Sequence, residues 1–350
     1  MHTASARRLR LLGAALPAAA FLIPATVAGS TPVASSSAAH SVAAPQAKKS
    51  TAAAASQPLL QYQSSGAPVE TKPAVYLVFW GEQWAVGWKD VSNSGNVYSS
   101  AQAQTYITDY FKYVSSTATA WNAVTTQYCS GVAVGATSCP STKPHVTNPP
   151  VFGGVWVDTT SPPPPPVVPD NCAVLACIVP GTTADAANLL AAEAVRAEQH
   201  FLGTGNNPNA DFMLMLPEAT TTTGVIGACA YHSQAQDSKG RWVTYSNMPY
   251  VMNMNVLCGE NFVNNDDSFG NGFFDGYSIV AGHEFAEAET DPLPFTHTAW
   301  QDSSGNEIGD KCAWISPGTP GGSHDIGPDA AGHRYAVQTL WSNKSGSCTG

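Results

Sequence analysis

The sequence predicts a mixed α/β or α+β fold, in which a mixed β-sheet is flanked by helices and held by disulfide bonds. Three short apolar runs, at residues 74–80, 151–157 and 211–217, have the length and composition of buried strands. Segments with helical spacing separate these runs, and eight cysteines lie beyond residue 128. About 285 residues remain after the N-terminal low-complexity region, enough for a large core.

The chain begins with the pattern of a signal peptide, predicted for residues 1–28. Arg7, Arg8 and Arg10 precede an apolar run at 11–27, and small residues follow at a cleavage-like position. The general secretory route is expected, with the twin-arginine route as the alternative. No later apolar run reaches the roughly 18 residues of a membrane span. The mature protein is therefore expected to be secreted and extracellular.

Residues 29–63 are rich in Ala and Ser, a composition that cannot bury enough apolar surface to offset the entropy of ordering. We expect a disordered spacer there, followed by a single secreted domain at 64–350. An alternative division gives that domain two lobes, 64–260 and 261–350. A domain of this size can form one core or two closely joined ones.

The charge balance excludes some partners. The formal net charge is −10, and removal of the three signal-peptide arginines takes it to −13. An acidic chain of this kind is repelled by nucleic acids and by anionic membranes.

An even number of cysteines in an exported chain indicates disulfide bonds. Sequence alone leaves about 105 connectivities for eight cysteines. Pairing of nearest neighbours is the simplest expectation: Cys129 with Cys139, Cys172 with Cys177, Cys229 with Cys258, and Cys312 with Cys348.

Among the individual elements, the strand at 74–80 is followed by a helix whose apolar residues, from Tyr106 to Val114, share one face, with Ser99 or Ser100 as N-cap. The strand at 151–157 leads into a proline run, residues 162–166, expected to be extended and exposed. Proline-rich segments of this kind are assigned by composition alone.

The second half begins with an alanine-rich helix at 184–201, which ends before Gly203, and the strand at 211–217. Apolar and amide side chains alternate at 250–258, which predicts a strand with one solvated face. A Gly/Asn/Asp-rich loop at 261–276 then leads into a helix at 277–290, with Ser278 or Asp275 as cap and Pro292 beyond its end.

This last helix concentrates the ionisable residues. His283 and Glu287 are four positions apart and share a face, and Glu284 points about a quarter-turn away. The geometry resembles the zincin active-site helix, in which residues i and i+4 bind zinc and the glutamate at i+1 activates the bound water. Glu287 stands where that motif has a second histidine, and carboxylate oxygen is an accepted zinc ligand. The sequence therefore predicts His283 and Glu287 as metal ligands and Glu284 as catalytic base.

The alternative is that Glu284, Glu287 and Glu289 form a solvated helix face. The helix contains no lysine or arginine that could neutralise these acids at helical spacing. Unpaired acids beside a histidine repel one another unless a cation joins them. A metal or proton-transfer role is therefore favoured.

A zinc site with one water needs a third protein ligand. Residues 300–314 predict a hairpin turning at 303–306, which brings Asp302, Glu307 and Asp310 into one region beside Cys312. Glu307 is preferred as ligand over Asp310 because its side chain is longer, and the other supports it. His232, close to Cys229, is the next candidate.

Four segments in this order resemble the EXORDIUM-like, or phosphate-induced protein, family: "VYLVFWGEQW", "ADFMLMLP" with "CAYHS", "DGYSIVAGHEFAEAETDP" and "AWQDSSGNEIGDKCAW". The resemblance covers about residues 75–314. It implies an extracellular protein, associated in plants with the cell wall and growth, and it supplies no reaction. The Ala/Ser-rich spacer and the proline run depart from the plant pattern, and the composition suggests a bacterial source.

Two functions remain open. The first is a secreted zinc peptidase, with the strand predicted at 250–256 offering its edge to a peptide. The second is a non-enzymatic extracellular protein, binding or associated with the cell wall, whose acids hold structural calcium; the loop "NNDDSFGNG" could donate oxygens. Two carboxylates and one imidazole are a harder ligand set, in the sense of hard and soft Lewis bases, than three imidazoles. Manganese or calcium could therefore compete with zinc for this site.

Overall fold

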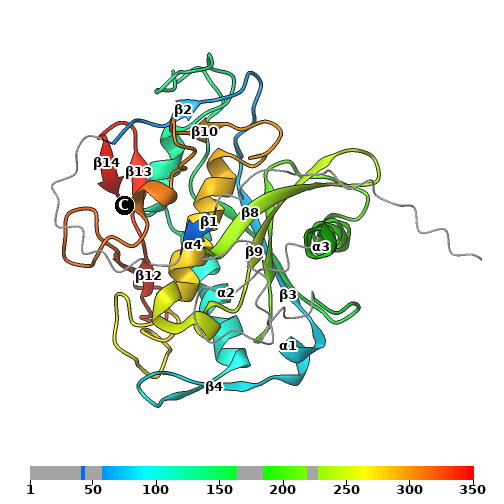
Figure 1. Ribbon diagram of the computed structural model, residues 1–350, viewed down its shortest axis with the longest axis vertical. Helices are drawn as coiled ribbons and strands as arrows, with labels where there is room; N and C mark the ends of the chain where they lie inside the picture. Colours follow the sequence, from blue (N-terminus) through cyan, green and yellow to red (C-terminus); the bar gives the residue numbers. More distant parts are fainter. Residues whose placement is uncertain (1–40, 44–56, 164–183, 219–227) are drawn as a thin grey trace, which may run out of the picture. The chain divides into compact units, whose positions relative to one another are not determined.

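The computed structural model describes residues 41–43, 57–163, 184–218 and 228–350. Its centre is a mixed β-sheet with strand order β1-β8-β9-β7-β3-β6 (Figure 1). The strands are β1 (Ser41–Ala43), β3 (Ala74–Trp80), β6 (Val151–Asp158), β7 (Ala210–Met215), β8 (Ala228–Gln236) and β9 (Trp242–Met248). The predicted class, a mixed sheet flanked by helices and held by disulfides, is confirmed.

Parallel pairing joins the four strands at one side of the sheet. β3 pairs in parallel with both β6 and β7, and β7 pairs in parallel with β9. β8 is antiparallel to β9, and the short strand β1 is antiparallel to β8. The apolar runs predicted as strands at 74–80, 151–157 and 211–217 correspond to β3, β6 and β7.

Helices cover both faces of the sheet (Figure 1). Alternate residues of β3 define the two faces: Leu77 and Phe79 pack with helices α2 (Ser100–Ser116) and α4 (Asp275–Thr290), whereas Val78 packs with α3 (Ala184–Leu202). The period of two along a strand therefore distributes the core over two layers. All three helices were predicted.

The start of α2 has the expected chemistry. Ser99 is its N-cap: the Ser99 hydroxyl accepts from the Gln102 backbone N–H, and the Gln102 side chain accepts from the Ser99 backbone N–H. This reciprocal pair satisfies two N–H groups that the helix itself cannot. Five of the buried residues of α2 are aromatic or branched apolar residues: Tyr106, Ile107, Tyr110, Phe111 and Val114.

Smaller elements surround this framework. They are α1 (Glu82–Val86), β2 (Gln61–Tyr62), β4 (Lys89–Val91), β5 (Val97–Ser99), β10 (Trp300–Gln301), β11 (His324–Ile326), β12 (Tyr335–Val337), β13 (Leu340–Ser342) and β14 (Ser347–Thr349), with the 3-10 helices η1 (Asn122–Gln127), η3 (Val251–Cys258) and η4 (Asp310–Cys312). Disulfides join Cys129 to Cys139, Cys229 to Cys258 and Cys312 to Cys348, as predicted. The fourth predicted pair, Cys172 with Cys177, lies outside the described residues.

The strand predicted at 250–258 is wrong. This segment forms the 3-10 helix η3, which is kinked at Asn255, where φ is 49°. A residue with this positive φ interrupts an extended strand, and positive φ is more frequent for asparagine than for most other residues. The alternation of apolar and amide side chains therefore does not reflect a sheet.

Two boundaries also differ from expectation. Leu60 and Tyr62 are fully buried, and Tyr62 lies in β2, which pairs with β10, so the folded region begins before residue 64. Residues 41–43 of the predicted spacer form β1. The predicted signal peptide, and most of the proline run, lie outside the described residues. None of the helices among the described residues is long and apolar enough to span a membrane.

Candidate metal centre

Helix α4 is buried along its whole length and packs against both β8 and β12. Glu284 and Glu287 have no exposed surface, and Glu289 is 2% exposed. A solvated helix face is therefore excluded. Burying ionised carboxylates is costly unless cations or hydrogen bonds compensate their charge. The groups that contact these side chains therefore indicate the chemical role of the helix.

Three ligand atoms converge at the first of two sites, the Asp310 cluster, formed by His283, Glu287 and Asp310. Any two of the three atoms lie within 4.8 Å of each other. His283 Nε2 is 3.0 Å from Glu287 Oε1 and 3.6 Å from Asp310 Oδ1. Two ligands of one zinc ion, at bond lengths of about 2.0 to 2.2 Å in tetrahedral geometry, lie about 3.3 to 3.6 Å apart. The distance from His283 Nε2 to Asp310 Oδ1 falls within this range, whereas the distance to Glu287 Oε1 is shorter by about 0.3 Å, so these two atoms must separate slightly to share a cation.

The protonation of His283 follows from its neighbour Gln338. The Gln338 Nε2 atom donates to Gly309 O at 2.8 Å, which leaves Gln338 Oε1 facing His283 Nδ1 at 3.1 Å. Because an amide oxygen only accepts, His283 Nδ1 carries the hydrogen. In the neutral ring, the lone pair of Nε2 then points at two carboxylate oxygens. A metal ion or an added proton must lie among these three atoms.

Gly309 also lies close against the His283 ring. A Cβ atom at this position would lie 2.7 Å from His283 Nδ1, closer than real Cβ atoms approach other atoms. The φ of Gly309 is −81°, which any residue can adopt. The glycine is therefore required by the close approach to the imidazole, not by its backbone conformation.

The second site, the His232 cluster, is formed by His232, Glu284 and Glu287. His232 Nδ1 lies 3.6 Å from Glu284 Oε2 and 3.5 Å from Glu287 Oε2. His232 Nε2 lies 3.1 Å from the backbone carbonyl of Asp291. All three side chains of this cluster are fully buried.

Two further acids, Glu307 and Asp291, lie next to the His232 ring. Glu307 Oε2 is 3.7 Å from His232 Nε2. Burial, together with the charges of Glu287 and Asp291, raises the pKa of Glu307 well above its ordinary value. Burial also raises the pKa of Asp291, to about 6. Perturbed carboxylates of this kind are typical of sites that transfer protons.

The structure brings together the residues predicted from the sequence in a modified arrangement. Asp310, which was the second choice as third ligand, lies in the cluster with His283, whereas Glu307 lies beside it. His232 also enters the site. Asp302 does not, because it forms an ion pair with Lys311 at 3.1 Å. Gln338 was missed, since no local pattern marks a glutamine 55 residues beyond the histidine that it contacts.

The loop considered for calcium has other uses for its acids. Asp275 accepts from the backbone N–H groups of Val263, Asn264 and Gly272, and it does not act as the side-chain cap of α4. Asp267 likewise accepts from backbone N–H groups of its own loop. Asp266 accepts from Asn96 Nδ2 at 3.3 Å, and its other oxygen is buried without a hydrogen bond among the described residues. The groups of described residues that could hold a metal ion include no acid of this loop.

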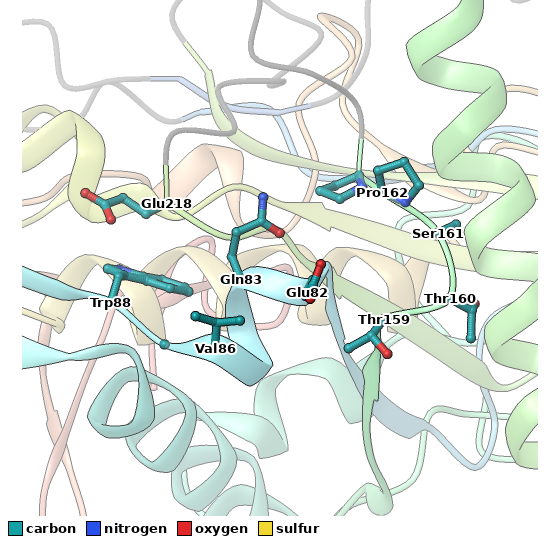
Figure 2. Close-up of a pocket in the computed structure, with 11 residues that line it drawn as sticks. Glu82, Gln83, Val86, Trp88, Thr159, Thr160, Ser161, Pro162 and Glu218 are labelled. Carbon is teal, nitrogen blue, oxygen red and sulfur yellow. The ribbon is translucent and has the colours of Figure 1, made fainter. Parts of the chain in front are cut away.

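A separate cavity of about 560 Å³ opens at the carboxyl ends of β3 and β6 (Figure 2). The first long helix after β3, α2, lies on one face of the sheet, and the helix that follows β6, α3, lies on the other. Open α/β sheets commonly form a ligand crevice at the carboxyl ends of two adjacent strands whose following helices lie on opposite faces. The described lining of the cavity includes Glu82, Trp88 and Glu218 but no lysine or arginine, so an anionic ligand is disfavoured. None of the residues of the Asp310 cluster or the His232 cluster lines it.

Comparison with known proteins gave no match to any family model, curated protein or solved structure. The EXORDIUM-like resemblance therefore stays a prediction, and the site itself has to carry the functional argument.

Proposed function

We propose that this protein is a secreted metal-dependent hydrolase, specifically a zinc peptidase, and that the Asp310 cluster holds its metal. The observation that carries the proposal is the direction of the His283 lone pair. Gln338 fixes the hydrogen on Nδ1, and Nε2 faces Glu287 and Asp310 inside a buried site. Imidazole nitrogen and carboxylate oxygen are both accepted ligands of zinc, and carboxylate oxygen also suits manganese.

Three protein ligands leave a coordination position for water. A metal at such a site lowers the pKa of bound water and polarises a carbonyl group. The protein's own contribution is to orient the imidazole through Gln338 and Gly309 and to supply a carboxylate that accepts the water's proton. Glu284, predicted from the sequence, and Glu307 are the two candidates for that carboxylate.

Access to the metal is from the side of Asp310. Its side chain is 17% exposed, whereas the side chains of His283 and Glu287 are fully buried. Among the three ligand side chains, Asp310 is the exposed one, so we infer that a substrate carbonyl approaches past it. Exclusion of water from the remaining sides strengthens every electrostatic interaction at the metal.

A peptide is the proposed substrate because of the sheet edge next to the site. β8 carries His232; the three-residue strand β1 pairs with residues 228–231 of its outer edge, and no other strand among the described residues pairs with that edge at 232–236. An extended chain segment can thus add to β8 by backbone hydrogen bonds. This edge replaces the segment at 250–256, which is not a strand. The three disulfides support the predicted extracellular location.

The test is hydrolysis of an unstructured protein such as reduced casein by the purified chain, before and after chelation and after addition of Zn²⁺. We expect activity that chelator removes and zinc restores. His283→Gln should lose both metal and activity. His333→Gln, a second histidine beside an aspartate, is the matched control and should lose neither.

A chain that binds metal at His283 yet cleaves no peptide would favour the alternative, an extracellular binding protein with a structural metal. A chain that binds no divalent metal would contradict both functions.

A further inference from the structure

The two carboxylate oxygens of Glu287 face different histidines. Oε1 lies 3.0 Å from His283 Nε2, and Oε2 lies 3.5 Å from His232 Nδ1. Glu287 is therefore shared by the Asp310 cluster and the His232 cluster, one oxygen to each. A carboxylate in this position can bridge two cations.

The hydrogen of His232 is placed by a backbone carbonyl. His232 Nε2 lies 3.1 Å from Asp291 O, which only accepts, so Nε2 carries the hydrogen and donates it. In the neutral ring, the lone pair of Nδ1 then faces the carboxylates of Glu284 and Glu287. Nδ1 is fully buried and makes no hydrogen bond within the described part of the chain.

The distances favour a metal over a shared proton. A protonated imidazole donating to a carboxylate would lie at about 2.7 to 2.9 Å from its oxygen. His232 Nδ1 is instead 3.5 and 3.6 Å from two carboxylate oxygens. These values match the separation of about 3.3 to 3.6 Å between two ligands of one tetrahedral metal ion.

We propose that the His232 cluster binds a second divalent cation and that Glu287 bridges it to the cation in the Asp310 cluster. The inference rests on the proposed function in one respect, that the first metal is held by His283, Glu287 and Asp310. Both sites offer one imidazole nitrogen and carboxylate oxygens, so both suit Zn²⁺ or Mn²⁺. Pairs of ions in such sites lie about 3.5 to 4 Å apart and hold a reacting oxygen between them.

A second cation decides between the two candidate proton acceptors. Glu284 becomes a metal ligand, and Glu307 is left as the carboxylate that exchanges protons with water. This assignment differs from the zincin pattern, in which the glutamate after the first histidine is the base.

The first experiment counts metal ions in the full-length mature chain. After saturation with Zn²⁺ and removal of the excess, we expect two equivalents by elemental analysis. His232→Gln and Glu284→Gln should each retain one equivalent, because the Asp310 cluster remains. The controls His333→Gln and Glu260→Gln should retain two; Glu260 is also buried, and it accepts from Asn93.

The second experiment measures the distance between the ions. Two Mn²⁺ ions bridged by one carboxylate couple magnetically, so the paramagnetic resonance spectrum of the saturated wild-type chain should lack the six-line signal of isolated Mn²⁺. His232→Gln, with circular dichroism unchanged, should restore that signal. A variant that only disturbed the fold would lose bound manganese altogether.

Three results would contradict the second site but not the proposed hydrolase. They are one zinc equivalent in the wild-type chain, two equivalents in folded His232→Gln, and a six-line manganese spectrum at saturation. A wild-type chain that binds no zinc would instead contradict the proposed function itself.

Discussion

His283 Nδ1 lies 3.1 Å from Gln338 Oε1, although the two residues are 55 positions apart in the chain. Gln338 lies in the short segment between β12 and β13, and β12 packs against α4. The contact fixes the tautomer of a proposed metal ligand, and the same amide also holds the carbonyl of Gly309.

The first prediction tests this contact. Gln338→Leu removes the acceptor for Nδ1, so the ring can carry its hydrogen on either nitrogen and can rotate. Loss of such a supporting hydrogen bond typically lowers metal affinity 10- to 100-fold. Zinc affinity measured by competition with a chelator should fall by this amount. Gln104→Leu, which removes a side-chain bond to Trp84 O at a remote site, should leave the affinity unchanged.

Gly309→Ala should displace the His283 ring. The added Cβ would lie 2.7 Å from the ring, so the imidazole has to move away from its ligand position. We expect zinc affinity to fall at least tenfold. The control, Gly66→Ala, has open space but a φ of 79°, and strain there should cost about 1 to 2 kcal/mol of stability without changing affinity. Equal affinity in Gly309→Ala and wild type would contradict the proposed ligand geometry.

Glu307→Gln should preserve metal binding and lower peptide turnover. The amide keeps the shape of the side chain but can neither donate nor accept the proton that the carboxyl group exchanges, and proton transfer by a positioned group typically contributes 10²- to 10⁴-fold. Steady-state turnover should therefore fall at least 100-fold with metal content unchanged. If turnover survives and the metal is lost, Glu307 is a ligand, as the sequence had suggested.

Metal affinity should depend on pH. Burial alone would lower the pKa of His283, but the charge of Glu287 and the contact with Asp310 outweigh it and raise the pKa well above its ordinary value. The metal-free site therefore holds a proton on Nε2, which the cation must displace. Between pH 8 and pH 6, affinity should fall about tenfold per unit for each proton released. Chelator competition that gives a pH-independent affinity would contradict this displacement.

Removing the disulfide between Cys312 and Cys348 should destabilise the protein and weaken the metal site. The closed loop spans 37 residues, counting both cysteines, and its closure contributes on the order of 3 to 4 kcal/mol in the loop-entropy description. Asp310 lies in the same 3-10 helix as Cys312. Cys312→Ser with Cys348→Ser should lower the thermal midpoint, and added zinc should recover part of the loss.

Much of the fold was predictable because its signals are local. The run at 74–80 is apolar on both faces, and the structure places it as β3 between two strands, with helices on either side. The capping box at Ser99 was half recognised, as a capping serine. By contrast, 250–258 has strand-like alternation, and only the kink at Asn255 shows that it cannot pair. Local periodicity cannot reveal a single left-handed residue.

The sequence by itself determined which residue types share a helix face in α4: His283 and Glu287 are four positions apart on any α-helix, so their meeting depends on backbone geometry alone. It also gave the correct pairing of the cysteines that the structure describes.

Only the tertiary structure decided that the acids of α4 are buried, that Asp310 meets His283 and Glu307 lies beside it, and that His232 from β8 faces the second oxygen of Glu287. Asp310 lies 27 positions from His283, and His232 lies 55 positions from Glu287. Their distances depend on how the sheet, α4 and the C-terminal hairpins pack, and no spacing along the chain contains that information.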